Sequence, residues 1–182
     1  MREILALMET ASKLKELQRT GWIEHRVPGN LETTASHIFG VTLLAWWFSE
    51  KEMSKKERII KMALVHDLLE SITGDFTPKS ISKSERDKIE ERSLEIIVTM
   101  LPKELKEEIW SLIHEYRNSE TKESRIVKAC DRLDTLFQAY FYLKANRISK
   151  SAFEDFFSFA EEACKEGLAK EILTKLGNAA KG

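Results

Sequence analysis

Hydrophobic residues recur along this chain at steps of three and four positions, which is the spacing of one face of an α-helix. The first segment carries this face on Ile4, Leu7, Met8, Ala11, Leu14 and Leu17. The segment from Glu32 to about Glu50 is apolar on nearly all sides, which predicts a central buried helix. Since we find no strand alternation, internal repeat or low-complexity tract, the pattern predicts an all-α protein.

Breaks in the pattern divide the chain into separate helices. Glycine, proline and polar residues interrupt it at 19–31 and 74–80, where we predict loops. Serine–glutamate pairs with capping-box spacing predict helix starts at Ser54, Ser82 and Ser151. The predicted helices end near residues 17, 50, 70, 100, 117 and 144, and C-terminal helices cover about 150–178. The prediction is a single domain, residues 1–182, of about seven to eight helices.

Length and composition argue against several classes of protein. A chain of 182 residues that is 42% hydrophobic can bury a full core, and its net charge of −1 argues against a nucleic-acid-binding face. The charged, amphipathic N-terminus is unlike a signal peptide, and no apolar run is long enough to span a bilayer. Two cysteines, Cys130 and Cys164, are too few for a disulfide framework, so we expect a reducing compartment. We therefore expect a cytoplasmic protein that binds neither nucleic acid nor membrane.

The pair His66 and Asp67 is the most informative chemical feature. The pair lies toward the end of the apolar run 60–69. Burying an unpaired carboxylate there would cost free energy, so we expect a cation beside Asp67. His37 and Asp131 lie in other apolar, helix-like segments. A core histidine beside a carboxylate would explain one such residue, but two imidazoles and two carboxylates suit a catalytic divalent metal with open positions. We expect one ion of Mn²⁺, Co²⁺, Ni²⁺, Fe²⁺ or Zn²⁺, with Mg²⁺ as a further candidate.

The longer pattern around these residues resembles the HD-domain metal-dependent phosphohydrolases, whose motif is H…HD…D. It is most similar to their small 5'-deoxyribonucleotidase branch. The similar segments span about residues 19–140 and include RTGW at 19–22, ALVHDLLESITGDFTP at 63–78, HEYR at 114–117 and VKACD at 127–131. Glu32 and Thr33 resemble the family element ahead of the first histidine, whereas Ser36 stands where the family has an acidic residue.

The resemblance implies catalytic roles for two further carboxylates. Glu70 follows Asp67 by about one helical turn, so it can reach the same pocket. We expect it to act as general acid or base, or to orient water. Asp75 belongs to the same family signature and is expected beside the reacting phosphate ester, in reach of the sugar or base.

The resemblance also implies substrate contacts in the two loops. The first loop is one residue longer than in the family, so either Arg19 or Arg26 would grip the phosphate through its forked guanidinium. Trp22 could stack on the base, or it could be a lid over the core. Thr77 and Pro78 would meet the sugar or base.

The implied reaction removes the 5'-phosphate from deoxynucleoside 5'-monophosphates. One alternative keeps the metal and changes the substrate to a triphosphate, an alarmone or a cyclic nucleotide. Such substrates call for more Arg and Lys, whereas the loops supply only Arg19, Arg26, Lys79 and Lys83. Another alternative is a non-catalytic ligand-binding module that retains a structural metal.

Two further expectations concern the remaining chain. His114 is either a ligand for a second metal or a surface residue, and His25 lies in the first loop. In the C-terminal helix, Phe159 points about 100–120° away from the apolar face that holds Phe153, Phe156, Phe157 and Ala160. Aromatic residues on two faces favour a homodimer, and the alternative is a fully enclosed helix.

Overall fold

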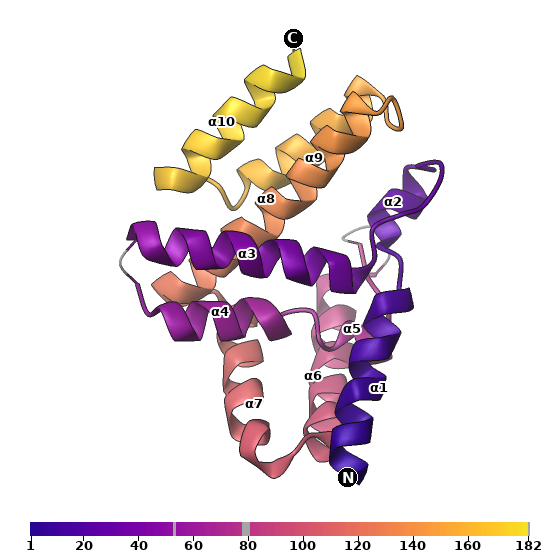
Figure 1. Ribbon diagram of the computed structural model, residues 1–182, viewed down its shortest axis with the longest axis vertical. Coiled ribbons are helices and arrows are strands. Elements are labelled where there is room, and N and C mark those ends of the chain that lie inside the picture. The colour runs from indigo at the N-terminus through magenta and orange to yellow at the C-terminus, as the bar shows by residue number, and fades with distance from the viewer. Residues whose placement is uncertain (53, 78–80, 182) are drawn as a thin grey trace.

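Helices build the fold of the computed structural model, which describes residues 1–52, 54–77 and 81–181 (Figure 1). The helices are α1 (Arg2–Glu16), α2 (Thr20–Glu24), α3 (Thr34–Glu52), α4 (Lys56–Val65), α5 (Glu70–Thr73), α6 (Lys83–Met100), α7 (Lys103–Asn118), α8 (Lys122–Lys144), α9 (Lys150–Glu161) and α10 (Gly167–Lys181). The predicted all-α fold is confirmed. Beyond the long helices that periodicity predicted, the structure adds the short helices α2 and α5. Within the described ranges, no helix combines the length and apolar character needed to cross a membrane.

The core forms around α8, which runs behind α3 and α4 in Figure 1. Apolar residues of α8 are buried along its length, among them Val127, Leu133 and Leu136. They meet buried residues of α3 and α4, including Val41 and Ile59. Because these three helices share one core, residues on their facing sides lie close together although they are far apart in the sequence.

Helix starts follow the capping prediction at one of three places. Ser82 caps α6 in a complete capping box with Glu85. The prediction at Ser54 is wrong by one residue, because Lys55 is the N-cap of α4 and makes no side-chain cap. The prediction at Ser151 is also wrong, because the Ser149 side chain accepts from the Ala152 backbone N–H and caps α9.

The helix predicted to reach residue 70 ends at Val65. A tight turn follows, with backbone hydrogen bonds from Leu68 to Val65 (3.0 Å) and from Glu70 to Asp67 (3.1 Å). These three-residue bonds wind the chain more tightly than an α-helix does. The pair His66 and Asp67 therefore lies in a turn between α4 and α5.

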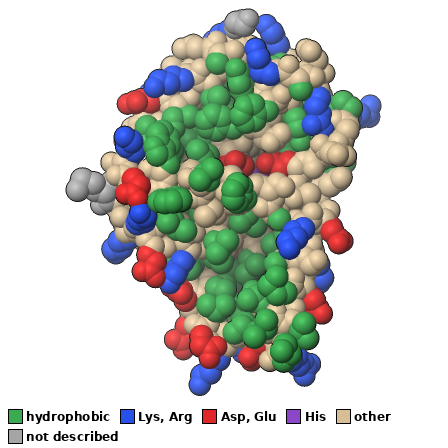
Figure 2. All heavy atoms as spheres, in the orientation of Figure 1, with side chains coloured by type: hydrophobic (Ala, Val, Ile, Leu, Met, Phe, Trp, Pro, Cys, Tyr) green, Lys and Arg blue, Asp and Glu red, His purple; other side chains and the backbone are tan. Residues whose placement is uncertain are grey.

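The prediction that the segment 32–50 is buried on all sides is wrong for one side of α3. Four large side chains there are exposed, namely Phe39 (72%), Leu43 (55%), Trp46 (50%) and Trp47 (44%). Figure 2 shows hydrophobic side chains spread over the face of the molecule on which α3 and α4 lie, with charged side chains mostly toward its edge. Patches of this kind on a folded protein mark interaction surfaces.

The aromatic residues of α9 pack within the chain. Phe153 is buried, and Phe157 lies against Gly177 of α10. Phe156 contacts Trp22, and Phe159 lies under the guanidinium of Arg132. Phe156, Phe157 and Phe159 nevertheless stay partly exposed, so α9 is not fully enclosed, and its aromatic residues find contacts without a second copy of the chain.

Candidate metal centre and active site

Three elements bring the four predicted metal ligands together. His37 comes from α3, Asp131 from α8, and His66 and Asp67 from the turn after α4. His37 Nε2 lies 3.2 Å from Asp131 Oδ1 and 3.7 Å from Asp67 Oδ2, and His66 Nε2 lies 3.1 Å from Asp67 Oδ2. Ligand atoms of His37, His66 and Asp67 all lie within 4.8 Å of one another, so this group could hold a metal ion.

The contacts that Nδ1 of each histidine makes suit metal binding through Nε2. His66 Nδ1 lies 2.7 Å from the Ala63 carbonyl oxygen, and His37 Nδ1 lies 2.8 Å from Asp134 Oδ2. With Nδ1–H donating to these oxygens, each Nε2 keeps its lone pair for a metal. Both Nε2 atoms are buried and have no hydrogen-bond partner. Buried polar atoms normally have partners, so this arrangement fits an ion between them.

Asp134 is a residue that sequence reasoning missed. Its carboxylate reaches His37 only because position 40 is a glycine, since a Cβ on Gly40 would lie 2.0 Å from Asp134 Oδ1. A glycine inside an otherwise apolar helix was the available signal, because it marks a close approach by another group.

Asp131 is oriented by two neighbours. The Tyr116 hydroxyl donates to Asp131 Oδ2 at 2.7 Å, and Arg132 donates to the same oxygen at 3.1 Å. This leaves Oδ1 directed at His37. Burial would raise the pKa of Asp131, but Arg132 and His37 hold it well below its ordinary value. Asp131 is therefore an anionic ligand candidate at neutral pH.

Of the two candidate arginines, Arg19 is the one that faces this centre. Its Nη1 donates to Asp67 Oδ2 at 3.1 Å, and its Nε lies 3.9 Å from Asp75 Oδ2. Burial lowers the pKa of Arg19, but the carboxylates of Asp75 and Asp67 raise it above its ordinary value. Arg26 is exposed and has a positive φ of 52°.

Glu70 lies beside the centre and is held by α3. Its Oε2 accepts a hydrogen bond from the Thr34 hydroxyl at 2.9 Å. Burial and the negative charge of Asp67 raise the pKa of Glu70 well above its ordinary value. Both effects favour the protonated form of Glu70 more than water does.

Two of the other predicted substrate contacts, Trp22 and Thr77, line a second cavity of about 370 Å³ that Arg19 and Asp75 also line. Trp22 is 1% exposed, donates from Nε1 to Glu32 Oε2 at 2.9 Å and packs on Phe156. The Thr77 hydroxyl donates to Glu24. Pro78 lies outside the described residues.

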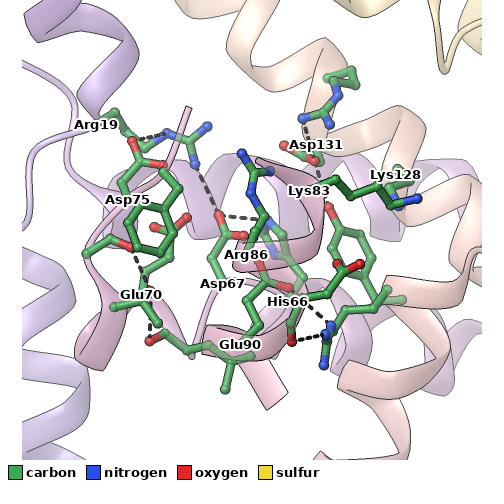
Figure 3. Close-up of a pocket in the computed structure, with 18 of the residues that line it drawn as sticks. Arg19, His66, Asp67, Glu70, Asp75, Lys83, Arg86, Glu90, Lys128 and Asp131 are labelled. Atoms are coloured by element: carbon green, nitrogen blue, oxygen red, sulfur yellow. Dashed lines mark hydrogen bonds and ion pairs between the residues drawn. The ribbon is translucent and has the colours of Figure 1, made fainter. Parts of the chain in front are cut away.

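A cavity of about 530 Å³ opens beside the candidate ligands. Figure 3 shows Arg19 and Asp75 on one side of it and Asp131 with Lys83 and Lys128 on the opposite side. Helices α6, α7 and α8 add cations that the count of loop residues missed: Arg86, Arg117, Lys128 and Arg132. The cavity is therefore better supplied with positive charge than the sequence indicated.

The two other histidines lie apart from this centre. His114 packs on Trp110 with ring centroids 4.2 Å apart, and its Nε2 lies 3.4 Å from Glu91 Oε1. Among the described residues, no ligand-like group includes it. His25 packs on Phe156.

The geometry defines a class, namely all-α proteins that gather two histidines and two aspartates at a cavity between helices. Residues 11–173 match the family model described as HD domain, and the chain belongs to this family.

The chain is also similar to named relatives and to a solved structure. The chain is 36% identical over 168 residues to 5'-deoxynucleotidase HDDC2 of Dictyostelium discoideum, covering 85% of this chain and 88% of that protein. It is 34% identical over 144 residues to 5'-deoxynucleotidase hdd1 of Schizosaccharomyces pombe, covering 76% and 72%. The crystal structure of the PH0347 protein from Pyrococcus horikoshii has a TM-score of 0.77 and 27% identity, over 97% of each chain.

Proposed function

We propose that this protein is a divalent-metal-dependent phosphohydrolase that removes the 5'-phosphate from deoxynucleoside 5'-monophosphates. The observation that carries the proposal is the pair of buried Nε2 atoms of His37 and His66, which have no hydrogen-bond partner and lie beside the carboxylates of Asp67 and Asp131. Relatives named 5'-deoxynucleotidase support the substrate class.

His37, His66, Asp67 and Asp131 would hold the metal. When bound there, a divalent ion supplies Lewis acidity toward a phosphoryl oxygen and makes water more acidic. Two imidazoles and two carboxylates suit Mn²⁺, Co²⁺, Ni²⁺, Fe²⁺ or Zn²⁺, and Mg²⁺ remains a candidate.

Three side chains of the cavity would act on the substrate. Arg19 is already held between Asp67 and Asp75, so its guanidinium is oriented for a phosphate before substrate arrives. Glu70 in its protonated form would donate a proton to the leaving 5'-oxygen, with Thr34 holding its orientation. Asp75 would contact the sugar next to the phosphate.

The test is a phosphate-release assay on metal-free protein with each metal added back. We expect deoxynucleoside 5'-monophosphates to be cleaved faster than ribonucleoside 5'-monophosphates, 3'-monophosphates and triphosphates. Faster cleavage of triphosphates or 3'-monophosphates would overturn the substrate class, and equal rates on ribo and deoxy forms would overturn only the sugar preference.

One observation favours a second candidate function, the hydrolysis of a nucleotide with a longer phosphate chain. Arg86 of α6 and Lys128 of α8 line the cavity in addition to Arg19, which is more positive charge than one phosphate group needs. Arg117 is already engaged by Glu90 and Glu91, and Arg132 by Asp131. The triphosphate arm of the same assay decides between the two functions.

We also propose that the protein is a homodimer in the cytoplasm. A helix that is hydrophobic on all sides is normally buried, yet α3 exposes Phe39, Leu43, Trp46 and Trp47. A second copy of the chain would cover this face, since most soluble oligomers are symmetric homo-oligomers. Buried, free Cys130 and Cys164 support the reducing compartment.

A further inference from the structure

A third cavity, of about 760 Å³, lies between the first half of α8 and the segment that joins α9 to α10. Of its described lining residues, none is a candidate metal ligand, and neither Arg19 nor Asp75 is among them. It shares Lys128, Arg132 and Glu162 with the metal-centre cavity. The rest of its lining is its own, so it is a distinct cavity.

Positive charge dominates the lining of this third cavity. Among the described residues, its cationic side chains are Lys122, Arg125, Lys128, Arg132 and Lys165. Its carboxylates are those of Glu162 and Glu166, and both of these residues are exposed. Clefts lined by an excess of one charge concentrate ligands of the opposite charge. The third cavity therefore favours an anion.

Three of these cations have no carboxylate partner. Arg125 donates to a backbone oxygen at 2.8 Å, and Lys128 donates to a serine hydroxyl at 2.7 Å. In the part of the chain that the structure describes, Arg125, Lys128 and Lys165 form no ion pair. Burial and the positive charge of Arg132 lower the pKa of Lys128. An anion in the cavity would offset this repulsion between cations.

The start of α10 adds to the positive charge from the opposite wall. Helix α10 begins at Gly167, and Gly167, Leu168 and Ala169 all line the cavity. The first backbone N–H groups of a helix carry partial positive charge and have no carbonyl partner within the helix. They can therefore donate to an anion that the side chains of α8 also hold.

The cations of α8 are spread along the helix. Lys122, Arg125, Lys128 and Arg132 follow one another at steps of three or four positions, which places them in one stripe. From Lys122 to Arg132 this stripe is about 15 Å long, at the usual rise of an α-helix. A single phosphate group can contact only part of it, whereas a chain of phosphate groups can reach several cations.

We propose that the third cavity binds an anion with a chain of phosphate groups, which is either a free oligophosphate or the phosphate chain of a nucleoside triphosphate. Arg125, Lys128 and Lys165 hold the phosphate groups through charge-assisted hydrogen bonds. The start of α10 closes the site from the other side.

The test removes two cations that line this cavity and not the metal-centre cavity. The test variant combines Arg125→Gln with Lys165→Gln, both at exposed positions. The control variant combines Arg92→Gln with Lys170→Gln, which removes the same kinds of charge at exposed positions of α6 and α10 outside the cavity. Both variants and the wild type are titrated by calorimetry at one ionic strength. The ligands are tripolyphosphate, orthophosphate and the β,γ-imido analogue of ATP.

We expect the wild type to bind tripolyphosphate about 10-fold or more tightly than orthophosphate, because the chain reaches more cations. The test variant should bind tripolyphosphate about 10-fold or more weakly than the control variant does. The metal centre is the same in all three proteins, so binding there contributes equally. Equal affinities of the two variants, or a wild type that binds tripolyphosphate no more tightly than orthophosphate, would overturn the proposal.

The imido analogue identifies the source of the phosphate chain. If it binds the wild type more tightly than tripolyphosphate and loses this binding in the test variant, the ligand is a nucleoside triphosphate. Its base would then lie against the apolar lining that Phe48 and Leu168 supply. If tripolyphosphate binds at least as tightly as the analogue, the ligand is the oligophosphate itself.

Discussion

At His37, the hydrogen bond from Nδ1 to Asp134 leaves the Nε2 lone pair directed at the carboxylates of the candidate centre. Partners of this kind fix the ring and raise the basicity of a ligating histidine. Sequence patterns predicted the ligand types, because His and Asp are costly to bury in apolar segments unless they bind a partner such as a metal ion. They could not predict Asp134 or Tyr116, because each acts through a contact that only the packed helices create.

A substitution at Gly40 tests whether metal binding depends on the contact between Asp134 and His37. Gly40→Ala should push Asp134 away from His37 and weaken metal affinity by about 10–100-fold, the usual cost of losing such a partner. The measurement is metal titration of the apo protein. Gly177→Ala is the control, because it sets the same methyl group against Phe157 in the C-terminal helices and should leave metal affinity unchanged.

Glu70 is predicted to act in the chemistry and not in holding the metal. Glu70→Gln keeps the shape of the side chain and its contact with Thr34 but removes the proton donor. We expect the metal content to stay at the wild-type level and kcat to fall by about 10²–10⁴. Loss of the metal in this variant would instead identify Glu70 as a ligand.

At the scale of elements, periodicity located the long helices because each must bury one side. It missed the break after Val65, since the apolar run continues to Leu69 and only the backbone bonds of the turn reveal the change. It also misjudged α3, whose sequence shows an apolar surface but not which part of that surface the chain itself covers.

Glu115 joins three elements and gives a pH-dependent prediction. It accepts from Arg58 of α4 at 2.6 Å and from Thr121, the N-cap of α8, at 2.6 Å. Burial would raise the pKa of Glu115, but Arg58 and Thr121 lower it. A lowered pKa stabilises the fold above the ordinary value of 4.5, and this contribution is lost as the pH falls through the lowered value.

We therefore expect Glu115→Gln to lower the free energy of unfolding by about 1–2 kcal/mol at pH 7. The difference from the wild type should shrink as the pH falls below 4.5. Denaturant unfolding at several pH values measures it. Glu107→Gln, at an exposed position of α7, is the control and should change little. A difference that persists at low pH would contradict this account of Glu115.

At the scale of the whole molecule, the exposed face of α3 predicts self-association. Light scattering at micromolar concentration should give the mass of a dimer for the wild type. Leu43→Lys should shift the mass toward the monomer, because it puts a charge in the middle of the apolar face. Lys51→Glu, at an exposed position near the end of α3, is the control. A monomeric wild type would rule out the homodimer.

The most direct test of the account is the metal content and phosphate release of Asp67→Asn. This change keeps the shape of the side chain and removes one anionic ligand candidate. We predict a folded protein that has lost its metal and its activity on deoxynucleoside 5'-monophosphates. Asp87→Asn, an aspartate of the same cavity outside the ligand group, should retain both. An Asp67→Asn protein with full metal content and wild-type turnover would contradict the proposed metal centre.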